Sequence, residues 1–206
     1  MSRLPLVIAM AVLVLGVPPR ADAATPTEEL RGYTDRALRV LRDSTLTSSA
    51  RRAAVRDLAE EAFDVRETAR RTLGVHWEGR TPSEREEFVR LFRDFLERTF
   101  VPWVDWYGGE EIRYVGERRD GDTATVAAIV VVKRLGVEVP VESRLLLRGD
   151  RWRVYDVRIE HVSLVAYYRS QFDRIIRAAS YEELVHRLKA QIQVLRDERR
   201  EPPGRR

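Results

Sequence analysis

Residues 152–172 read WRVYDVRIEHVSLVAYYRSQF, and this stretch joins an extended segment to a helical one. In the first half, Tyr155, Val157 and Ile159 alternate with charged residues, which is the pattern of a strand with one apolar face. The alternation ends near Ser163, a residue type that often caps a helix. The stretch therefore predicts a strand at 152–160, followed directly by a helix.

Three more strands are predicted before this one, separated by turns that contain glycine. They are expected at 111–117, 123–133 and 137–147. The second is apolar on both faces and is typical of a central strand. The third alternates, with Pro140 on its polar side, which favours an edge position or a bulge. Consecutive strands with short turns predict an antiparallel meander of about four strands.

Helices are predicted on both sides of this meander. The clearest start is Thr81-Pro82-Ser83-Glu84, where Thr81 can cap the helix and Glu84 can close a capping box. An aromatic stripe then runs to Phe100, and Pro102 should kink or end the helix. Further helices are expected near 27–41, 49–62 and 64–73 and after Ser163 and Ser180, with box-like pairs Asp64/Glu67 and Ser180/Glu183. The class is therefore α+β, a twisted antiparallel sheet wrapped by helices.

The 206 residues divide into three parts. Residues 1–23 combine a basic start, an apolar run and a small-residue site at Ala21-Asp22-Ala23, which predicts a cleavable signal peptide and export. The alternative, a membrane anchor, needs about 20 apolar residues, and this run is shorter. A single domain is expected at 24–195, and a charged, disordered tail at 196–206.

Composition excludes several classes of function. There is no cysteine, so disulfides, thiolate metal sites and thiol catalysis are excluded. The net charge is only +4, although 35 of the 37 basic residues are Arg. Acidic and basic residues are interspersed along the chain, whereas nucleic-acid binding favours a surface stripe of one sign.

Enzymatic motifs are almost absent. There is no nucleophile elbow, phosphate loop or dinucleotide fingerprint, and the three histidines have no metal-ligand spacing. One alternative remains: a small cone-shaped fold could use Asp156 as a base with Tyr167 in an apolar cavity. Asp156 should, however, lie on the face opposite Tyr155 and Val157, pointing away from such a cavity.

Two stretches carry a family resemblance. They are residues 73–100, LGVHWEGRTPSEREEFVRLFRDFLERTF, and residues 154–172. Their order and separation resemble the toluene-tolerance (MlaC-like) family of periplasmic phospholipid-binding proteins, over roughly residues 27–192. The chain departs from the family at His161, where glycine is frequent, and at Ala166 and Tyr167, where an asparagine pair is frequent.

The resemblance implies a phospholipid carrier without catalytic activity, metal or cofactor. Lipid tails would lie in an apolar pocket between sheet and helices. The carrier would shuttle lipid between an outer-membrane lipoprotein complex and an inner-membrane ABC transporter, and so maintain outer-membrane lipid asymmetry. A hopanoid is an alternative ligand, because a branch of the family accompanies hopanoid synthesis. The sequence gives no sign of an oligomer, so a monomer is expected.

Candidate lipid-binding residues combine the apolar sheet face, the helix stripe and the strand-to-helix junction. They are Leu73, Trp77, Phe88, Phe92, Leu96, Phe100, Val130, Val132, Val139, Val141, Leu145, Tyr155, Val157, Ile159, Val162, Val165 and Tyr167. Each of these residues alone could equally be ordinary core. A third hypothesis is therefore a partner-binding protein with a filled core. Arg144, Arg158 and Arg169 could meet a lipid phosphate, although arginine is common throughout the chain.

Overall fold

The computed structural model describes residues 24–198, which form six α-helices and a five-stranded antiparallel sheet. The predicted α+β class is confirmed. The elements are α1 (Pro26–Arg42), α2 (Ser48–Ala62), α3 (Val65–Leu73), η1 (Gly74–His76), α4 (Pro82–Phe100), η2 (Val101–Trp106), β1 (Glu111–Asp120), β2 (Thr123–Val132), β3 (Val137–Arg148), β4 (Arg151–Ile159), β5 (Val162–Ser163), α5 (Leu164–Ala178) and α6 (Tyr181–Asp197). The proposed signal peptide lies outside the described residues. Helix α6 extends two residues into the expected tail, whose residues 199–206 also lie outside them.

The sheet is an open meander in the order β1-β2-β3-β4-β5. Strand β2 is internal, between β1 and β3, in agreement with the prediction that it is not an edge strand. The fifth strand was not predicted, because it is only two residues long and pairs with the end of β4. Pro140 occupies neither an edge strand nor a bulge, since β3 is internal; it lies just beyond the last pair between β3 and β4, Val141 with Ile159.

Side-chain caps determine where the helices begin. Thr81 and Glu84 form the predicted capping box at the start of α4, and Thr25 and Glu28 form another at α1. Asp64 accepts the backbone N–H of Glu67, but the reciprocal bond is missing because Glu67 binds arginines. The Ser180 cap of α6 is likewise one-sided.

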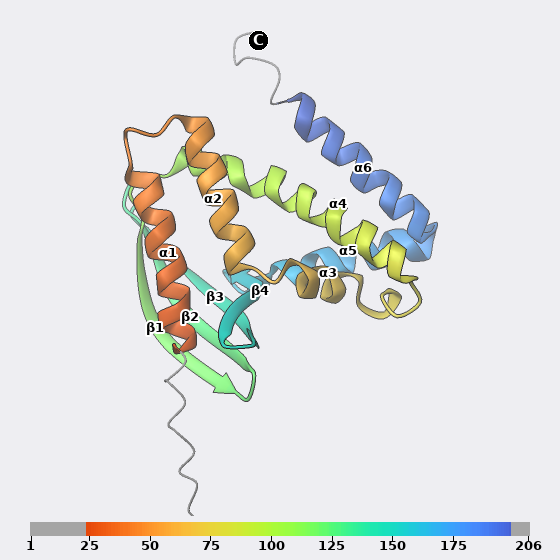
Figure 1. The fold of residues 1–206 in the computed structure, drawn as a ribbon, viewed down its shortest axis with the longest axis horizontal. Helices are drawn as coiled ribbons and strands as arrows, with labels where there is room; N and C mark the ends of the chain where they lie inside the picture. The colour runs from red at the N-terminus through yellow and green to blue at the C-terminus, as the bar shows by residue number, and fades with distance from the viewer. Residues whose placement is uncertain (1–23, 199–206) are drawn as a thin grey trace, which may run out of the picture.

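Residues 24–198 form two separate apolar cores. One lies between α1 and the sheet and contains Leu30, Val126, Leu145, Trp152 and Val154. The other lies among α3, α4, α5 and α6 and is built around stacked aromatic rings. Figure 1 shows α1 and α2 lying over the sheet, with α4, α5 and α6 extending to its side. The space between the two cores is where the candidate site lies.

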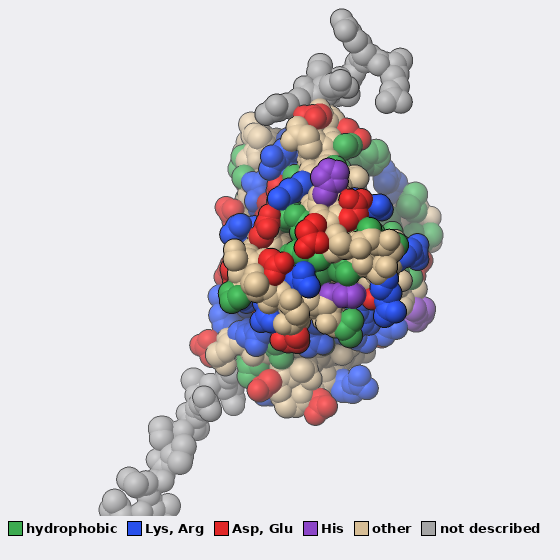
Figure 2. All heavy atoms as spheres, turned by 90° about the vertical axis from the view of Figure 1, so that its right-hand side faces the viewer, with side chains coloured by type: hydrophobic (Ala, Val, Ile, Leu, Met, Phe, Trp, Pro, Cys, Tyr) green, Lys and Arg blue, Asp and Glu red, His purple; other side chains and the backbone are tan. Residues whose placement is uncertain are grey.

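The surface carries charges of both signs. Figure 2, which views the molecule from the right-hand side of Figure 1, shows Lys and Arg side chains interspersed with Asp and Glu. The mixed surface expected from the sequence is therefore present on this face. Within residues 24–198, no helix is long and apolar enough to cross a membrane, and no cluster of His, Cys, Asp and Glu could hold a metal ion.

Candidate functional site

A cavity of about 530 Å³ opens between the two cores. Its walls come from α2, the α2–α3 junction, α3, α4, the start of η2, β4, β5 and α5. Phe63 and Val157, which border the sheet core, form one side, and Leu96 and Tyr168, which border the helical core, form another. The cavity is therefore an unfilled gap between two packed layers.

A β-bulge in β4 shapes the cavity floor. Arg144 of β3 pairs with Asp156 and Leu145 pairs with Val154, which leaves Tyr155 as the extra residue. The bulge shifts the alternation by one, so Val154 and Val157 both reach the apolar face despite their odd spacing. Tyr155 and Ile159 join Val157 in the cavity wall.

Two hydrogen bonds attach the helical layer to this bulge. The backbone N–H of Asp64 donates to the carbonyl of Val154 at 2.8 Å. The hydroxyl of Thr68 donates to the carbonyl of Tyr155 at 2.9 Å. These bonds hold the α2–α3 junction against β4, so that side chains from both converge on one space.

Seven of the candidate residues line the cavity together. They are Leu96, Phe100, Tyr155, Val157, Ile159, Val162 and Tyr167. They come from α4, β4 and α5, which were predicted separately, and from the short strand β5, which was not. For these seven residues, the structure places side chains that were proposed together as lipid-binding candidates around one cavity.

The other ten candidates lie elsewhere. Leu73, Trp77, Phe88 and Phe92 are buried in the helical core, where they touch other side chains. Leu145 is buried in the sheet core, and Val165 is buried beside a second, polar cavity. The remaining four stand half-buried on β2 and β3, outside the cavity wall: Val130, Val132, Val139 and Val141.

Several lining residues escaped sequence analysis. Ala59 and Phe63 lie on and just after α2, and the signal for them was the run of small inward residues on that helix. Tyr168 directly follows Tyr167, which was among the candidate lipid-binding residues. The others carried no distinguishing pattern: Val65, Thr68, Val101 and Leu164.

Charged residues stand at the cavity edge on α2 and α4. Arg56 pairs with Glu97 at 3.2 Å, and both side chains line the cavity. Burial raises the pKa of Glu97, since water is partly removed from the carboxylate. The mouth thus has a polar border beside an apolar interior.

Other residues at the cavity are apolar and exposed. Ile159, Val162 and Tyr167 line the cavity and are 48%, 61% and 51% exposed. Trp103 is 64% exposed. Its ring packs against the ring of Phe100 in the cavity wall, with 5.5 Å between the ring centroids. Large apolar side chains grouped in this way usually mark a binding surface.

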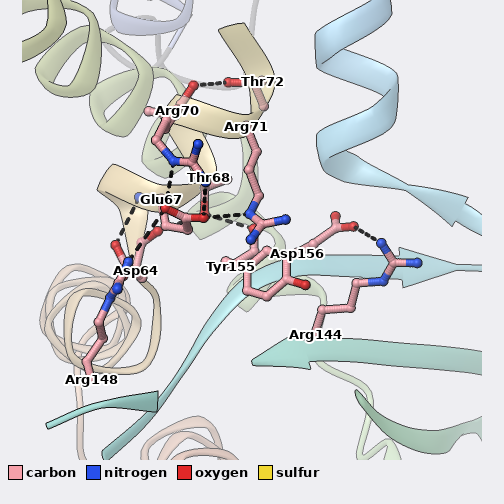
Figure 3. A network of polar contacts seen from close by, with 11 residues as sticks. Asp64, Glu67, Thr68, Arg70, Arg71, Thr72, Arg144, Arg148, Tyr155 and Asp156 are labelled. Atoms are coloured by element: carbon pink, nitrogen blue, oxygen red, sulfur yellow. Dashed lines mark hydrogen bonds and ion pairs between the residues drawn. The ribbon is translucent and has the colours of Figure 1, made fainter. Parts of the chain in front are cut away.

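Asp156 is committed to holding α5 in place. It is 2% exposed, accepts the Ser163 hydroxyl at 2.7 Å, and accepts the backbone N–H of Val165 at 3.0 Å. Figure 3 shows Arg144 reaching it from β3. Although predicted to point away from the cavity, Asp156 contributes to its wall, and both its oxygens are already bonded. Within residues 24–198, no hydrogen bond joins it to Tyr167.

Replacing Asp156 by Asn is expected to lower the free energy of unfolding by about 1–3 kcal/mol, because one charge-assisted bond to the α5 start is lost. Chemical denaturation measures this change. The control is Asp57→Asn at an exposed position of α2, expected to change stability by less than about 0.5 kcal/mol. Equal stability of both variants would show that Asp156 does not anchor the helix.

A buried carboxylate, Glu67, organises the arginines of α3. It accepts hydrogen bonds from Arg70 and Arg71 at 2.7 Å, and Arg148 of β3 lies 3.5 Å away (Figure 3). The Arg70 bond is the main cause that lowers the pKa of Glu67 from its ordinary 4.5 to about 2, against the opposing effect of burial.

This shift predicts a pH dependence of stability. A lowered pKa in the folded state stabilises the protein above pH 4.5, and the stabilisation is lost as the pH falls from 4.5 towards 2. The loss should be on the order of 2 kcal/mol, allowing for screening of the half-exposed arginines. Denaturation series at several pH values, compared with Glu67→Gln, measure it. Parallel pH profiles for the two proteins would contradict the assignment.

Comparison with known proteins identifies the family and the fold. The family model for the MlaC protein matches residues 31–190. A solved structure of the phospholipid-binding protein from Ralstonia solanacearum, in complex with a phospholipid, has the same fold, with a TM-score of 0.74. The two sequences are 21% identical, and the match covers 84% of this chain and 99% of that one. The chain belongs to the MlaC family.

Proposed function

We propose that this protein is a periplasmic phospholipid carrier that holds acyl chains in the cavity between its two cores. The observation that carries the proposal is the cavity itself: about 530 Å³, almost wholly apolar inside, and bordered at its mouth by exposed apolar side chains. The Ralstonia protein of the same fold was solved with a phospholipid bound, which supports this choice of ligand.

Energetics suit a carrier rather than a permanent store. Each acyl CH₂ removed from water contributes about 0.8 kcal/mol, so two chains of ~15 carbons gain on the order of 20 kcal/mol against water. A bilayer offers nearly the same gain. The preference of the cavity over a membrane is then a small difference between large terms, so the protein can load and unload. Direction must come from partners.

The proposed carrier role has consequences for the export, the domain organisation and the partners of the protein. Residues 1–23 act as a cleaved signal peptide, and residues 24–195 as the lipid-binding domain. The expected partners are an inner-membrane ABC transporter complex and an outer-membrane lipoprotein complex, between which the monomer moves lipid. The protein has no catalytic activity and needs no metal or cofactor. A hopanoid is the alternative cargo.

Mass spectrometry of an organic extract tests this proposal. The protein is purified from a periplasm without detergent, so that any lipid is acquired in the cell. A stoichiometric diacyl phospholipid is the expected result. A hopanoid would keep the carrier role and change the cargo. An empty extract, with no uptake from added phospholipid vesicles by the folded protein, would refute the proposal.

A further inference from the structure

A second cavity, of about 330 Å³, lies beside the first and has a different chemistry. Four arginines line it: Arg71 from α3, Arg144 from β3, Arg158 from β4 and Arg169 from α5. Arginine is common in this chain, so its presence alone means little. The informative feature is that arginines from four separate elements line one open cavity.

These guanidinium groups are not fully neutralised by the protein. Arg71 shares Glu67 with Arg70 and Arg148, whereas Arg144 pairs with Asp156 and Arg158 pairs with Glu142. Within residues 24–198, Arg169 makes no ion pair or hydrogen bond. The four lining arginines therefore have three carboxylate partners, and one of these, Glu67, is shared with two further arginines, so the cavity keeps an excess of positive charge.

Two of the arginines are also positioned by contacts with uncharged groups, Arg71 in addition to its ion pair with Glu67. Arg71 lies 4.1 Å over the ring of Tyr155, a cation–π contact. The stem of Arg169 crosses Gly74, where an added Cβ would be only 3.1 Å from Arg169 Cδ. Gly74 also has φ +55°, a backbone conformation that a larger residue would adopt only with strain. The fold thus orients both side chains without pairing them to a further carboxylate.

The one acidic residue in the wall of this cavity, Asp156, offsets one positive charge and is held in place by other hydrogen bonds. Its oxygens are bonded to Ser163 and Val165, and Arg144 stays 3.9 Å away. Asp156 and Tyr155 line both cavities, so the apolar and the arginine-lined spaces meet at these two residues.

The turn beside this cavity has an unusual backbone. Glu160 and His161 have φ of 47° and 72°, and His161 lines the cavity. Such angles suit a two-residue hairpin turn but normally require Gly or Asn. Strained residues of this kind are often found at binding sites.

We propose that the arginine-lined cavity binds a phosphate group. Guanidinium groups recognise phosphate oxygens through paired, charge-assisted hydrogen bonds, and the excess of cations supplies the attraction. The phosphate is either the head group of the carried lipid or free inorganic phosphate. In its lipid form the inference rests on the proposed function.

Titration calorimetry on the delipidated protein tests this. The probes are inorganic phosphate, dihexanoyl phosphatidylglycerol and the phosphate-free dihexanoylglycerol. Arg144→Gln and Arg169→Gln should each weaken binding of a phosphate-bearing probe about tenfold or more, since a charge-assisted bond is lost. Binding of dihexanoylglycerol should not change. The matched control is Arg174→Gln, also exposed on α5 but outside the cavity.

The outcomes separate the possibilities. Weakened binding of the phosphatidylglycerol identifies the head group as the occupant, and weakened binding of inorganic phosphate alone identifies free phosphate. Wild-type affinity of both variants for both phosphate probes would overturn the inference, with thermal unfolding showing that they are folded. If neither dihexanoyl lipid binds the wild type, the proposed carrier function fails instead.

Discussion

Replacing Ala59 by Trp is expected to empty the protein of lipid while leaving it folded. Ala59 lies on α2 with its side chain in the wall of the apolar cavity, next to Phe63. An indole ring at this position would occupy the space that acyl chains need. Because that space is already open, the usual overpacking penalty of about 1–3 kcal/mol should be largely avoided. Lipid per protein in an organic extract should fall about tenfold or more.

The matched control for this variant is Ala178→Trp. Ala178 is exposed near the end of α5 and lies outside the cavity wall. Its lipid content should equal that of the wild type. Full lipid occupancy in Ala59→Trp, with unchanged stability, would mean that the lipid binds elsewhere.

Replacing Phe92 by Ala is expected to have the largest effect on stability. Phe92 is fully buried and packs its ring against Phe88, Phe95, Tyr168 and Phe172. Truncating a buried Phe costs about 3–5 kcal/mol in unfolding free energy, because a cavity replaces these contacts. Chemical denaturation of delipidated protein measures the loss.

Phe100→Ala is the comparison variant, because Phe100 follows Phe92 by about two helical turns on the same face of α4. It is half-buried and lines the cavity. Its removal should cost less stability than removal of Phe92, and should reduce lipid content more. The reverse ranking would show that the cavity is part of an ordinary core rather than a ligand site.

This pair also explains why the site could be predicted only in part. Phe88, Phe92, Leu96 and Phe100 are spaced by four residues, so periodicity correctly placed them on one inward face. The surroundings of this inward face change along α4. The first two meet the aromatic core with α5 and α6, and the last two meet the cavity. A periodic pattern shows which face is covered, but not whether protein or ligand covers it.

Strand β4 shows a second limit. The alternation of Tyr155, Val157 and Ile159 was predicted and holds, and all three line the cavity. The bulge that brings Trp152 and Val154 to the same apolar face was not predicted, because it depends on pairing with β3. Strand lengths and turns follow from local residue types, whereas register depends on the partner strand.

The polar network illustrates competition between local and tertiary contacts. Asp64 and Glu67 have the spacing of a capping box, and the Asp64 half forms. Glu67 instead turns to Arg70 and Arg71, since charge-assisted bonds to arginine outweigh a single bond to the backbone. Local spacing could identify the helix start but not this exchange of partners.

Photo-crosslinking tests the central claim, that acyl chains lie between the two cores, most directly. The protein is loaded with a phosphatidylglycerol that carries a diazirine near the end of one chain, irradiated, and mapped by peptide mass spectrometry. Cross-links are expected in the cavity walls, at residues 56–68, 93–101 and 155–168, and should be lost in Ala59→Trp. Cross-links confined to other segments, or retained at full yield in Ala59→Trp, would contradict the account.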